Sequence, residues 1–157
     1  MKHEPHTEPQ YLEFIKQVVD TATVYTLQDH EDYYAECPSE TYNNDLGEPE
    51  AVYCFWHSKA AAQACQQDEW ANYELIEIHL ADFMYENLIE MDKDQNLVGV
   101  SFDAELYGTE IEPIELLADL LDEIKRRGLV EEFEEFEELQ NYREQWEQIA
   151  WQQQIIH

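Results

Sequence analysis

Basic residues are scarce in this sequence. Its 157 residues include only 8 lysines and arginines against 37 aspartates and glutamates, so the formal net charge at pH 7 is −29. A surface of this charge repels phosphate backbones and anionic membranes, so direct binding to nucleic acid or to a lipid surface is not expected. Three roles for the charge stay open: solubility, attraction of a basic protein partner, or imitation of phosphate in another protein's nucleic-acid-binding groove.

Glycine, cysteine and long apolar runs are also scarce. The four glycines are scattered, so there is no glycine-rich loop of the kind that holds phosphates. No apolar run has the length of a membrane span, and the N-terminal MKHEPHTEPQ lacks the apolar core of a secretory signal. The three cysteines, an odd number without regular spacing, are not typical of a disulfide framework. We therefore expect a reduced, cytoplasmic protein.

The sequence does contain enough apolar material for a packed core. Hydrophobic residues make up 44% of the chain and aromatic residues 13%, and the length suits one domain. The acidic residues are distributed along the whole chain rather than confined to a tail. This distribution weakens the idea of a neutral domain with an acidic interaction arm.

Helical spacing of apolar residues predicts several amphipathic helices. In the segment after Pro9, one face holds the apolar residues Tyr11, Phe14, Ile15, Val18 and Val19. In the segment that Pro113 opens, one side holds Ile114, Leu117, Leu121 and Ile124. Further helices are predicted over residues 59–67, 81–91 and 129–156.

Runs of β-branched and aromatic residues predict strands at residues 23–28, 33–37, 51–56, 73–80 and 97–102. The first two are expected to pair across a short turn. Residues 38–50, which collect proline, serine, asparagine and glycine, are expected to form a loop. The predicted fold class is α+β, with a mostly antiparallel sheet, packed helices and a long, amphipathic, acidic C-terminal helix.

Three segments are predicted along the chain: a leader over residues 1–9, an α+β domain over 10–128, and a C-terminal helix over 129–157. The apolar residues of the last segment recur every three or four positions from Leu129 to Ile149. We expect this helix to pack on the domain or on a partner chain, because such a stripe would form an aggregation-prone patch if exposed.

The stretch VYCFWHSKAAAQACQQDEW over residues 52–70 comes closest to a chemical motif. Cys54, His57, Cys65 and His79 could be drawn as a zinc site, and a cysteine–histidine pair could act as a nucleophile. However, structural zinc sites usually contain two closely spaced pairs of ligands, and only one such pair is present here. A reactive cysteine needs nearby cations to stabilise its thiolate, and cations are scarce in this sequence.

The favoured interpretation of this stretch is a buried strand that runs into a helix. Ser58 is expected to cap the helix, and Cys54 and Cys65 are expected to be core residues. We assign no catalytic residue, no metal and no cofactor to the chain.

Four segments together resemble a small bacterial family known as domain of unknown function 2750. They are FIKQVVDTATVYTLQD, CFWHSKAAAQACQQDEW, EIHLADFMYENLIEMDKDQNLVGVSF and IEPIELLADLLDEI. The resemblance covers residues 11–126 and leaves the final helix outside. It implies a small α+β domain and brings no catalytic residue with it.

The function that these observations favour is non-enzymatic: an acidic interaction protein, of the immunity or inhibitor type, that binds a basic protein as a monomer or a homodimer. The expected partner-binding residues are Glu131, Glu132, Glu134, Glu135, Glu137 and Glu138. One alternative is a small enzyme or metal-binding domain at the strand–helix corner near His57. Another is a nucleic-acid mimic.

Overall fold

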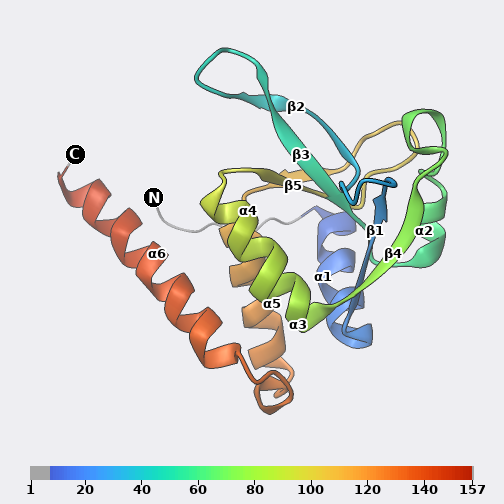
Figure 1. Ribbon diagram of the computed structural model, residues 1–157. Coiled ribbons are helices and arrows are strands. Elements are labelled where there is room, and N and C mark those ends of the chain that lie inside the picture. The colour runs from blue at the N-terminus through green and yellow to red at the C-terminus, as the bar shows by residue number, and fades with distance from the viewer. Residues whose placement is uncertain (1–7, 157) are drawn as a thin grey trace.

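The computed structural model describes residues 8–156, without the side chains of residues 41 and 153–156, and confirms the α+β class (Figure 1). The predicted leader at residues 1–9 lies largely outside the described residues. The first helix begins at its last residue, Pro9, whose missing N–H suits a first turn.

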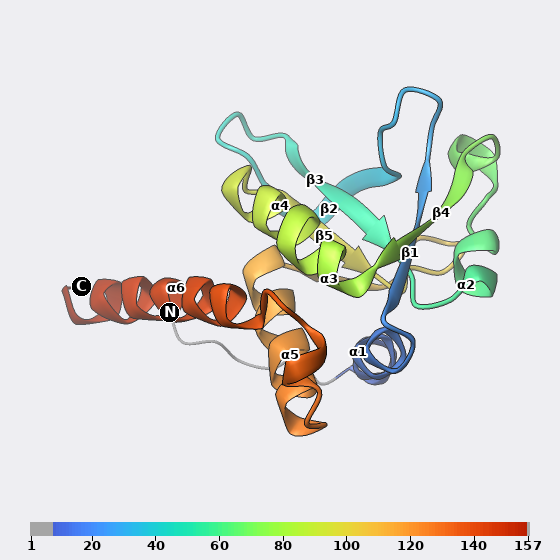
Figure 2. The same ribbon diagram turned by 60° about the horizontal axis from the view of Figure 1, so that its bottom comes forward.

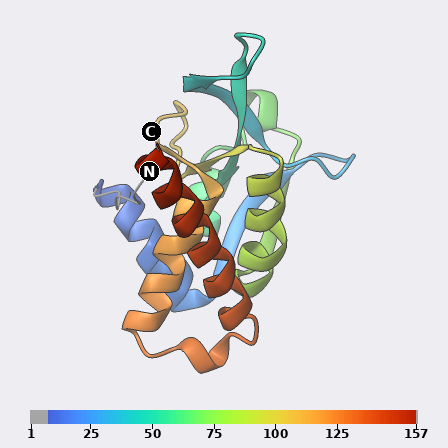
Figure 3. The same ribbon diagram turned by 90° about the vertical axis from the view of Figure 1, so that its left-hand side faces the viewer.

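Six α-helices are interspersed with short strands along the described part of the chain. Their bounds are α1 (Pro9–Thr21), α2 (Lys59–Gln63), α3 (Leu80–Asp82), α4 (Ile89–Lys93), α5 (Pro113–Arg126) and α6 (Phe136–Ile156). A π-helical turn, η2 (Phe83–Leu88), joins α3 to α4 in one continuous helix, and 3-10 turns occupy η1 (Asp68–Trp70) and η3 (Val130–Glu132). Helices α1, α5, α6 and α3–α4 stand next to one another below the strands (Figures 1 and 3).

Six strands form two sheets. Their bounds are β1 (Thr23–Gln28), β2 (Glu36–Asn43), β3 (Pro49–Phe55), β4 (Glu74–His79), β5 (Leu97–Val100) and β6 (Thr109–Ile111). The order is β1-β4 in one sheet and β2-β3-β5-β6 in the other. All pairings are antiparallel except β3 with β5. Isolated bridges from Tyr25 to Trp56 and from Gln28 to Tyr34 connect the two sheets.

Of two sequence-based expectations about the strands, one is met in part and one is wrong. The strand at residues 23–28 pairs along its length with β4, and its predicted pairing with the following segment is short: Gln28 bridges Tyr34, and the N–H of Ala35 donates a hydrogen bond of 2.8 Å to the carbonyl oxygen of Leu27. Residues 38–50, predicted as a loop, mostly form the β2–β3 hairpin, which projects from the body in Figure 1. Its far end stands in solvent, so its strands need few apolar residues and have the composition of a loop.

The predicted apolar faces of the first and fifth helices are confirmed. Every residue of both faces is buried, in a core shared by α1, α5, the α3–α4 helix and the inner sides of β1, β3 and β5. A second, smaller core surrounds Trp56 and Trp70, which are in edge-to-face contact with ring centroids 5.9 Å apart.

The C-terminal segment differs from the single helix predicted over residues 129–156. After Gly128, whose positive φ of 70° suits glycine, the chain forms η3, and α6 begins only at Phe136. Phe133 is extended between the two helices, and this break allows both Phe133 and Phe136 to enter the core. The second half of α6 extends away from α5 (Figure 2), and Ile149 is 56% exposed despite its place in the predicted stripe, although the neighbouring Ala150 is buried.

Candidate functional site: an acidic groove

A groove of about 470 Å³ lies between α6 and the helix formed by η2 and α4. We call it the α4/α6 groove. Its lining residues are Tyr85, Glu86, Ile89, Glu90, Lys93, Glu138, Leu139 and Tyr142. Residues three or four positions apart share a helix face, which explains how each helix presents several of them to the same groove.

The α4/α6 groove combines an apolar interior with an acidic edge. Leu139 is buried and Ile89 half-buried, and both belong to the hydrophobic core or pack against it. Glu86, Glu90 and Glu138 are exposed, so their charges stand in solvent around this apolar surface. Tyr85 lines the groove with 45% of its surface exposed, which leaves an aromatic ring available for contact.

A second cavity of about 340 Å³, here called the hairpin cleft, lies where the β2–β3 hairpin meets the end of α4, the start of α5 and the middle of α6. Its lining residues are Tyr42, Asn43, Glu50, Asp92, Gln95, Asn96, Leu97, Glu112, Pro113, Ile114 and Trp146. The two cavities are neighbours, because the hydroxyl of Tyr142, in the groove, donates a hydrogen bond to the carboxylate of Asp92, in the cleft.

The electrostatics of both cavities are strongly negative. Three carboxylates line each cavity, and Lys93 is the single cation among their lining residues. Partial burial of the Glu112 carboxyl, together with the negative charges of Glu115 and Asp92, raises the pKa of Glu112. Part of this side chain still contacts solvent. Burial, followed by the hydrogen bond to Asp92, raises the pKa of Tyr142. A cationic ligand would relieve this mutual repulsion.

The acidic side chains do not form a chelating site. Within residues 8–156, no group of three or more histidine, cysteine, aspartate or glutamate side chains is placed to hold a metal ion. Carboxylates spread around an apolar floor suit an extended organic cation or a basic peptide better than a compact ion.

Opposite pH dependences are expected for Glu112→Gln and Glu123→Gln. The pKa of Glu112 is raised, so its favourable protonated form is lost as pH rises through its folded pKa, and Glu112→Gln should stabilise the protein at neutral pH. Hydrogen bonds from Arg126 and Arg127 lower the pKa of Glu123, so its contribution is present above the ordinary pKa and lost as pH falls.

Thermal unfolding of both variants and the parent between about pH 4 and pH 7 checks this pair. At neutral pH, Glu112→Gln should melt higher than the parent and Glu123→Gln lower. Both differences should shrink towards the acidic end. If the melting temperatures of both variants shifted by the same amount and in the same direction at every pH, the conclusion that carboxylates repel one another in the cleft would be wrong.

The structure distributes the six glutamates expected to bind a partner over three short segments. Glu131 and Glu132 lie in η3, Glu134 and Glu135 in the turn after it, and Glu137 and Glu138 in the first turn of α6. Of these six, Glu138 lines the α4/α6 groove, and Glu132 lines a different cavity beside Arg127. Because α6 starts later than predicted, the six side chains do not follow one continuous helix face.

Sequence reasoning missed Glu86 and Glu90, which come from the middle of the chain. Their spacing with Lys93 over one helix face was visible in the sequence, but nothing local showed that α6 would lie opposite them. The cleft carboxylates Glu50 and Glu112 come from a hairpin and a helix start and had no common sequence pattern.

The strand–helix corner has the predicted local structure. The hydroxyl of Ser58 accepts a hydrogen bond of 3.1 Å from the backbone N–H of Ala61 and caps α2, as expected. Cys54 and Cys65 are buried in the smaller core, also as expected. His57 is half-buried, its Nδ1 has no hydrogen-bond partner, and it lines neither the groove nor the cleft.

His79, the fourth residue of the alternative zinc site, has a separate structural role. Its Nδ1 accepts a hydrogen bond of 3.2 Å from the backbone N–H of Ala81 at the start of α3. The sulfur of Cys65 contacts the carbonyl oxygen of Phe102 at 3.3 Å. These contacts fix the two residues at helix and loop positions, and they form no metal-binding group with Cys54 and His57.

Comparisons with known proteins identify a family but no activity. No curated protein matches the chain. Among solved structures, a chain titled "Anabaena Tic22 (protein transport)" is similar with 17% sequence identity and a TM-score of 0.36, over 56% of this chain and 44% of that one. Among the described residues, no helix combines the length and apolarity that a membrane crossing requires. A family match extends over residues 11–120, more than half of the sequence, so the chain belongs to the family described as "Protein of unknown function (DUF2750)".

Proposed function

We propose that this protein is a non-enzymatic, acidic binding protein that holds a basic segment of another protein in the α4/α6 groove. The observation that carries the proposal is the groove's composition: an apolar floor of Ile89 and Leu139 edged by three exposed glutamates. The scarcity of cations, with a net charge of −29, supports a partner of opposite charge.

The chemistry of arginine and lysine fits this composition. Their aliphatic stems can cover the apolar floor while their charged heads reach the carboxylates. A guanidinium can also stack on the exposed ring of Tyr85 and form paired hydrogen bonds with Glu138, whose interaction with Tyr85 already raises the pKa of that tyrosine. The hairpin cleft, with three more carboxylates, extends the binding surface.

Within this function we place an immunity or inhibitor role, in which the partner is a basic protein such as a nuclease. Opposite charges give such pairs fast association that falls with salt. One chain forms the whole groove, so a monomer suffices for binding. A reducing, cytoplasmic setting agrees with three cysteines that are free in the structure.

Charge reversal on two faces of the molecule tests the proposal. The triple variant Glu86→Lys, Glu90→Lys and Glu138→Lys changes the groove. The matched triple variant Glu74→Lys, Glu77→Lys and Glu105→Lys makes the same change in net charge at exposed positions on β4 and in the loop before β6, on the side away from α6 (Figure 1).

The probe is a synthetic helical peptide with arginines on one face and leucines on the other, and its control is the same composition in scrambled order. Calorimetric titration at low and physiological salt measures the affinities. We expect the groove variant to lose at least about tenfold in affinity, equivalent to about 1.4 kcal/mol. At physiological salt the matched variant should lose much less, because solvent ions screen charges on the side of the molecule away from the groove. Equal losses in both variants, or binding of neither peptide by the parent, would contradict the proposal.

A further inference from the structure

Two cysteines of the β2–β3 hairpin have their sulfur atoms in contact. The Sγ atoms of Cys37 and Cys54 are 3.9 Å apart. In the antiparallel register Cys37 lies opposite Val52, and Cys54 follows two residues later, so both side chains point to the same face. A disulfide bond is about 2 Å long, so bond formation requires the two sulfurs to move closer by roughly 2 Å, through side-chain rotation together with a local shift of the two strands at this diagonal position.

The third cysteine is held apart from this pair. Cys65 belongs to the same core, but its sulfur contacts the carbonyl oxygen of Phe102, which also accepts a 2.8 Å hydrogen bond from Nε1 of Trp56. The fold therefore pairs two of the three thiols and gives the third another partner.

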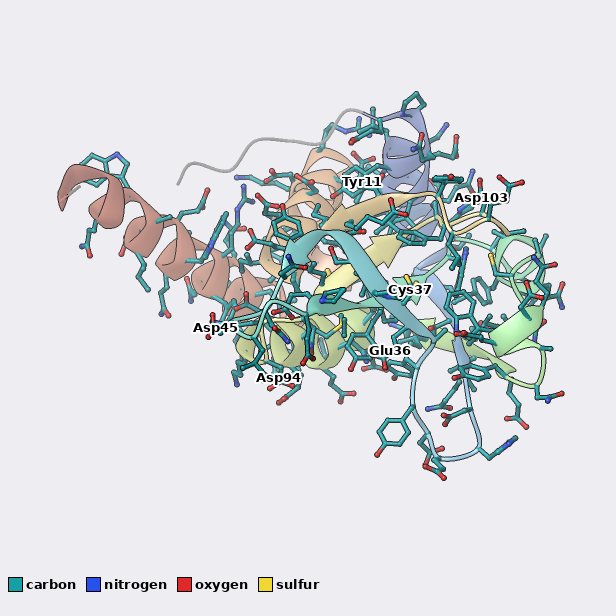
Figure 4. All side chains as sticks on the ribbon, turned by 90° about the horizontal axis from the view of Figure 1, so that it is seen from above. Tyr11, Glu36, Cys37, Asp45, Asp94 and Asp103 are labelled. Carbon is teal, nitrogen blue, oxygen red and sulfur yellow. The ribbon has the colours of Figure 1, made fainter. Side chains whose placement is uncertain are left out.

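The two paired thiols differ in access and acidity. Cys37 is 8% exposed, whereas Cys54 is fully buried. The interaction with Cys54 lowers the pKa of Cys37, although burial and the charges of Glu110, Glu36 and Glu40 oppose this effect. The same contact, with burial, raises the pKa of Cys54. Cys37 is thus the thiol that ionises first, and Figure 4 shows it on β2 next to Glu36.

We propose that Cys37 and Cys54 are a redox-active dithiol that closes to an intramolecular disulfide when the protein meets a peroxide. The Cys37 thiol loses its proton, and its thiolate attacks one oxygen of hydrogen peroxide. The O–O bond breaks, the sulfur becomes a sulfenic acid, and the leaving hydroxide takes up a proton equivalent to the one the thiol lost and departs as the first water. The sulfur of Cys54 then attacks this sulfenic sulfur. Its thiol proton leaves with the hydroxyl group as a second water. The peroxide gains two electrons and the dithiol loses them.

The bond would fix the base of the hairpin whose outer residues line the hairpin cleft. Cys37 lies at the start of β2 and Cys54 near the end of β3, and Tyr42, Asn43 and Glu50 lie between them in the chain. Dithiols of this kind in reducing compartments are typically transient and sensing rather than structural. The inference does not depend on the function proposed for the α4/α6 groove.

The experiment treats the reduced, folded full-length protein with hydrogen peroxide. Remaining thiols are then alkylated in denaturant, and intact mass and peptide mapping give the products. We expect the mass to fall by two hydrogen atoms, one cysteine of the three to remain alkylated, and a peptide linking Cys37 to Cys54. Cys65→Ser should give the same link, and Cys37→Ser should not lose the two hydrogens.

Oxidation of the same protein in urea keeps the test independent of how the variants fold. In the unfolded chain the links should involve Cys65 as well, because the fold no longer selects the pair. Three alkylated cysteines after treatment of the folded protein, overoxidised Cys37 without a link, or preferential loss of Cys65 would each overturn the proposal.

Discussion

Replacing Trp56 by alanine is expected to lower the free energy of unfolding by about 3–5 kcal/mol, the usual effect of removing a large buried aromatic side chain. Trp56 is fully buried in the smaller core. Its backbone exchanges hydrogen bonds of 2.8 and 2.9 Å with Tyr25, which connects the two sheets. Its ring nitrogen donates a hydrogen bond of 2.8 Å to the carbonyl oxygen of Phe102.

Two further variants separate the contributions of this side chain. Trp56→Phe keeps an aromatic ring but leaves the carbonyl of Phe102 without its nitrogen donor. The free energy of unfolding of this variant should therefore lie between those of the parent and Trp56→Ala. Trp151→Ala is the matched control, because Trp151 is 61% exposed and its loss should change stability by about 0.5 kcal/mol or less. Denaturant unfolding measures all three. Equal losses of stability in Trp56→Ala and Trp151→Ala would contradict the buried position of Trp56 and the exposed position of Trp151.

The features that could be predicted from the sequence are local ones, in which the residues that share a helix face or form a cap are three or four positions apart. The face of α1 was predictable because residues three or four positions apart share one side of any helix, and a side as apolar as Tyr11 to Val19 has to be buried. The Ser58 cap was predictable for the same reason, because donor and acceptor are three residues apart.

Pairings between distant segments could not be recognised in this way. The parallel pairing of β3 with β5 joins Val52 to Leu97, and the continuous apolar run of β3 indicated burial without saying which strand lies beside it. The same limit applies to the groove. Its two walls meet through Tyr142 and Asp92, which are 50 residues apart, and neither carries a local motif.

In the C-terminal helix, the helical spacing of apolar residues was recognised correctly but did not predict which of them are buried. Apolar residues recur at helical spacing up to Ile149, but burial depends on where the helix axis lies as well as on the period. Leu139 is 2% exposed because the first turns of α6 lie against α5 and α4. Ile149 is about three turns further along and is 56% exposed, whereas Ala150 beside it is buried, so this part of α6 is covered on one side and Ile149 faces solvent on another.

Leu139→Ala and Ile149→Ala, two changes on the same helix, should therefore differ widely in effect. We expect Leu139→Ala to lower the free energy of unfolding by about 2–5 kcal/mol, because it leaves a cavity between α6 and the main core. Ile149→Ala should change it by about 0.5 kcal/mol or less, because the side chain already contacts solvent. The helix propensity of alanine favours both variants slightly, so it does not produce the difference.

Chemical denaturation of the two variants measures the difference, and sedimentation at several concentrations shows whether a second chain takes part. If α6 docks on its own domain through its first half, the cost at Leu139 is independent of protein concentration. A large cost at Ile149 that shrinks on dilution would instead show that a second copy covers the outer half of the helix, because a dimer interface stabilises the parent less as the concentration of its chains falls. Equal and small costs at both positions would show that α6 contributes little to the core and that the groove it forms with α4 is not a fixed feature of the fold.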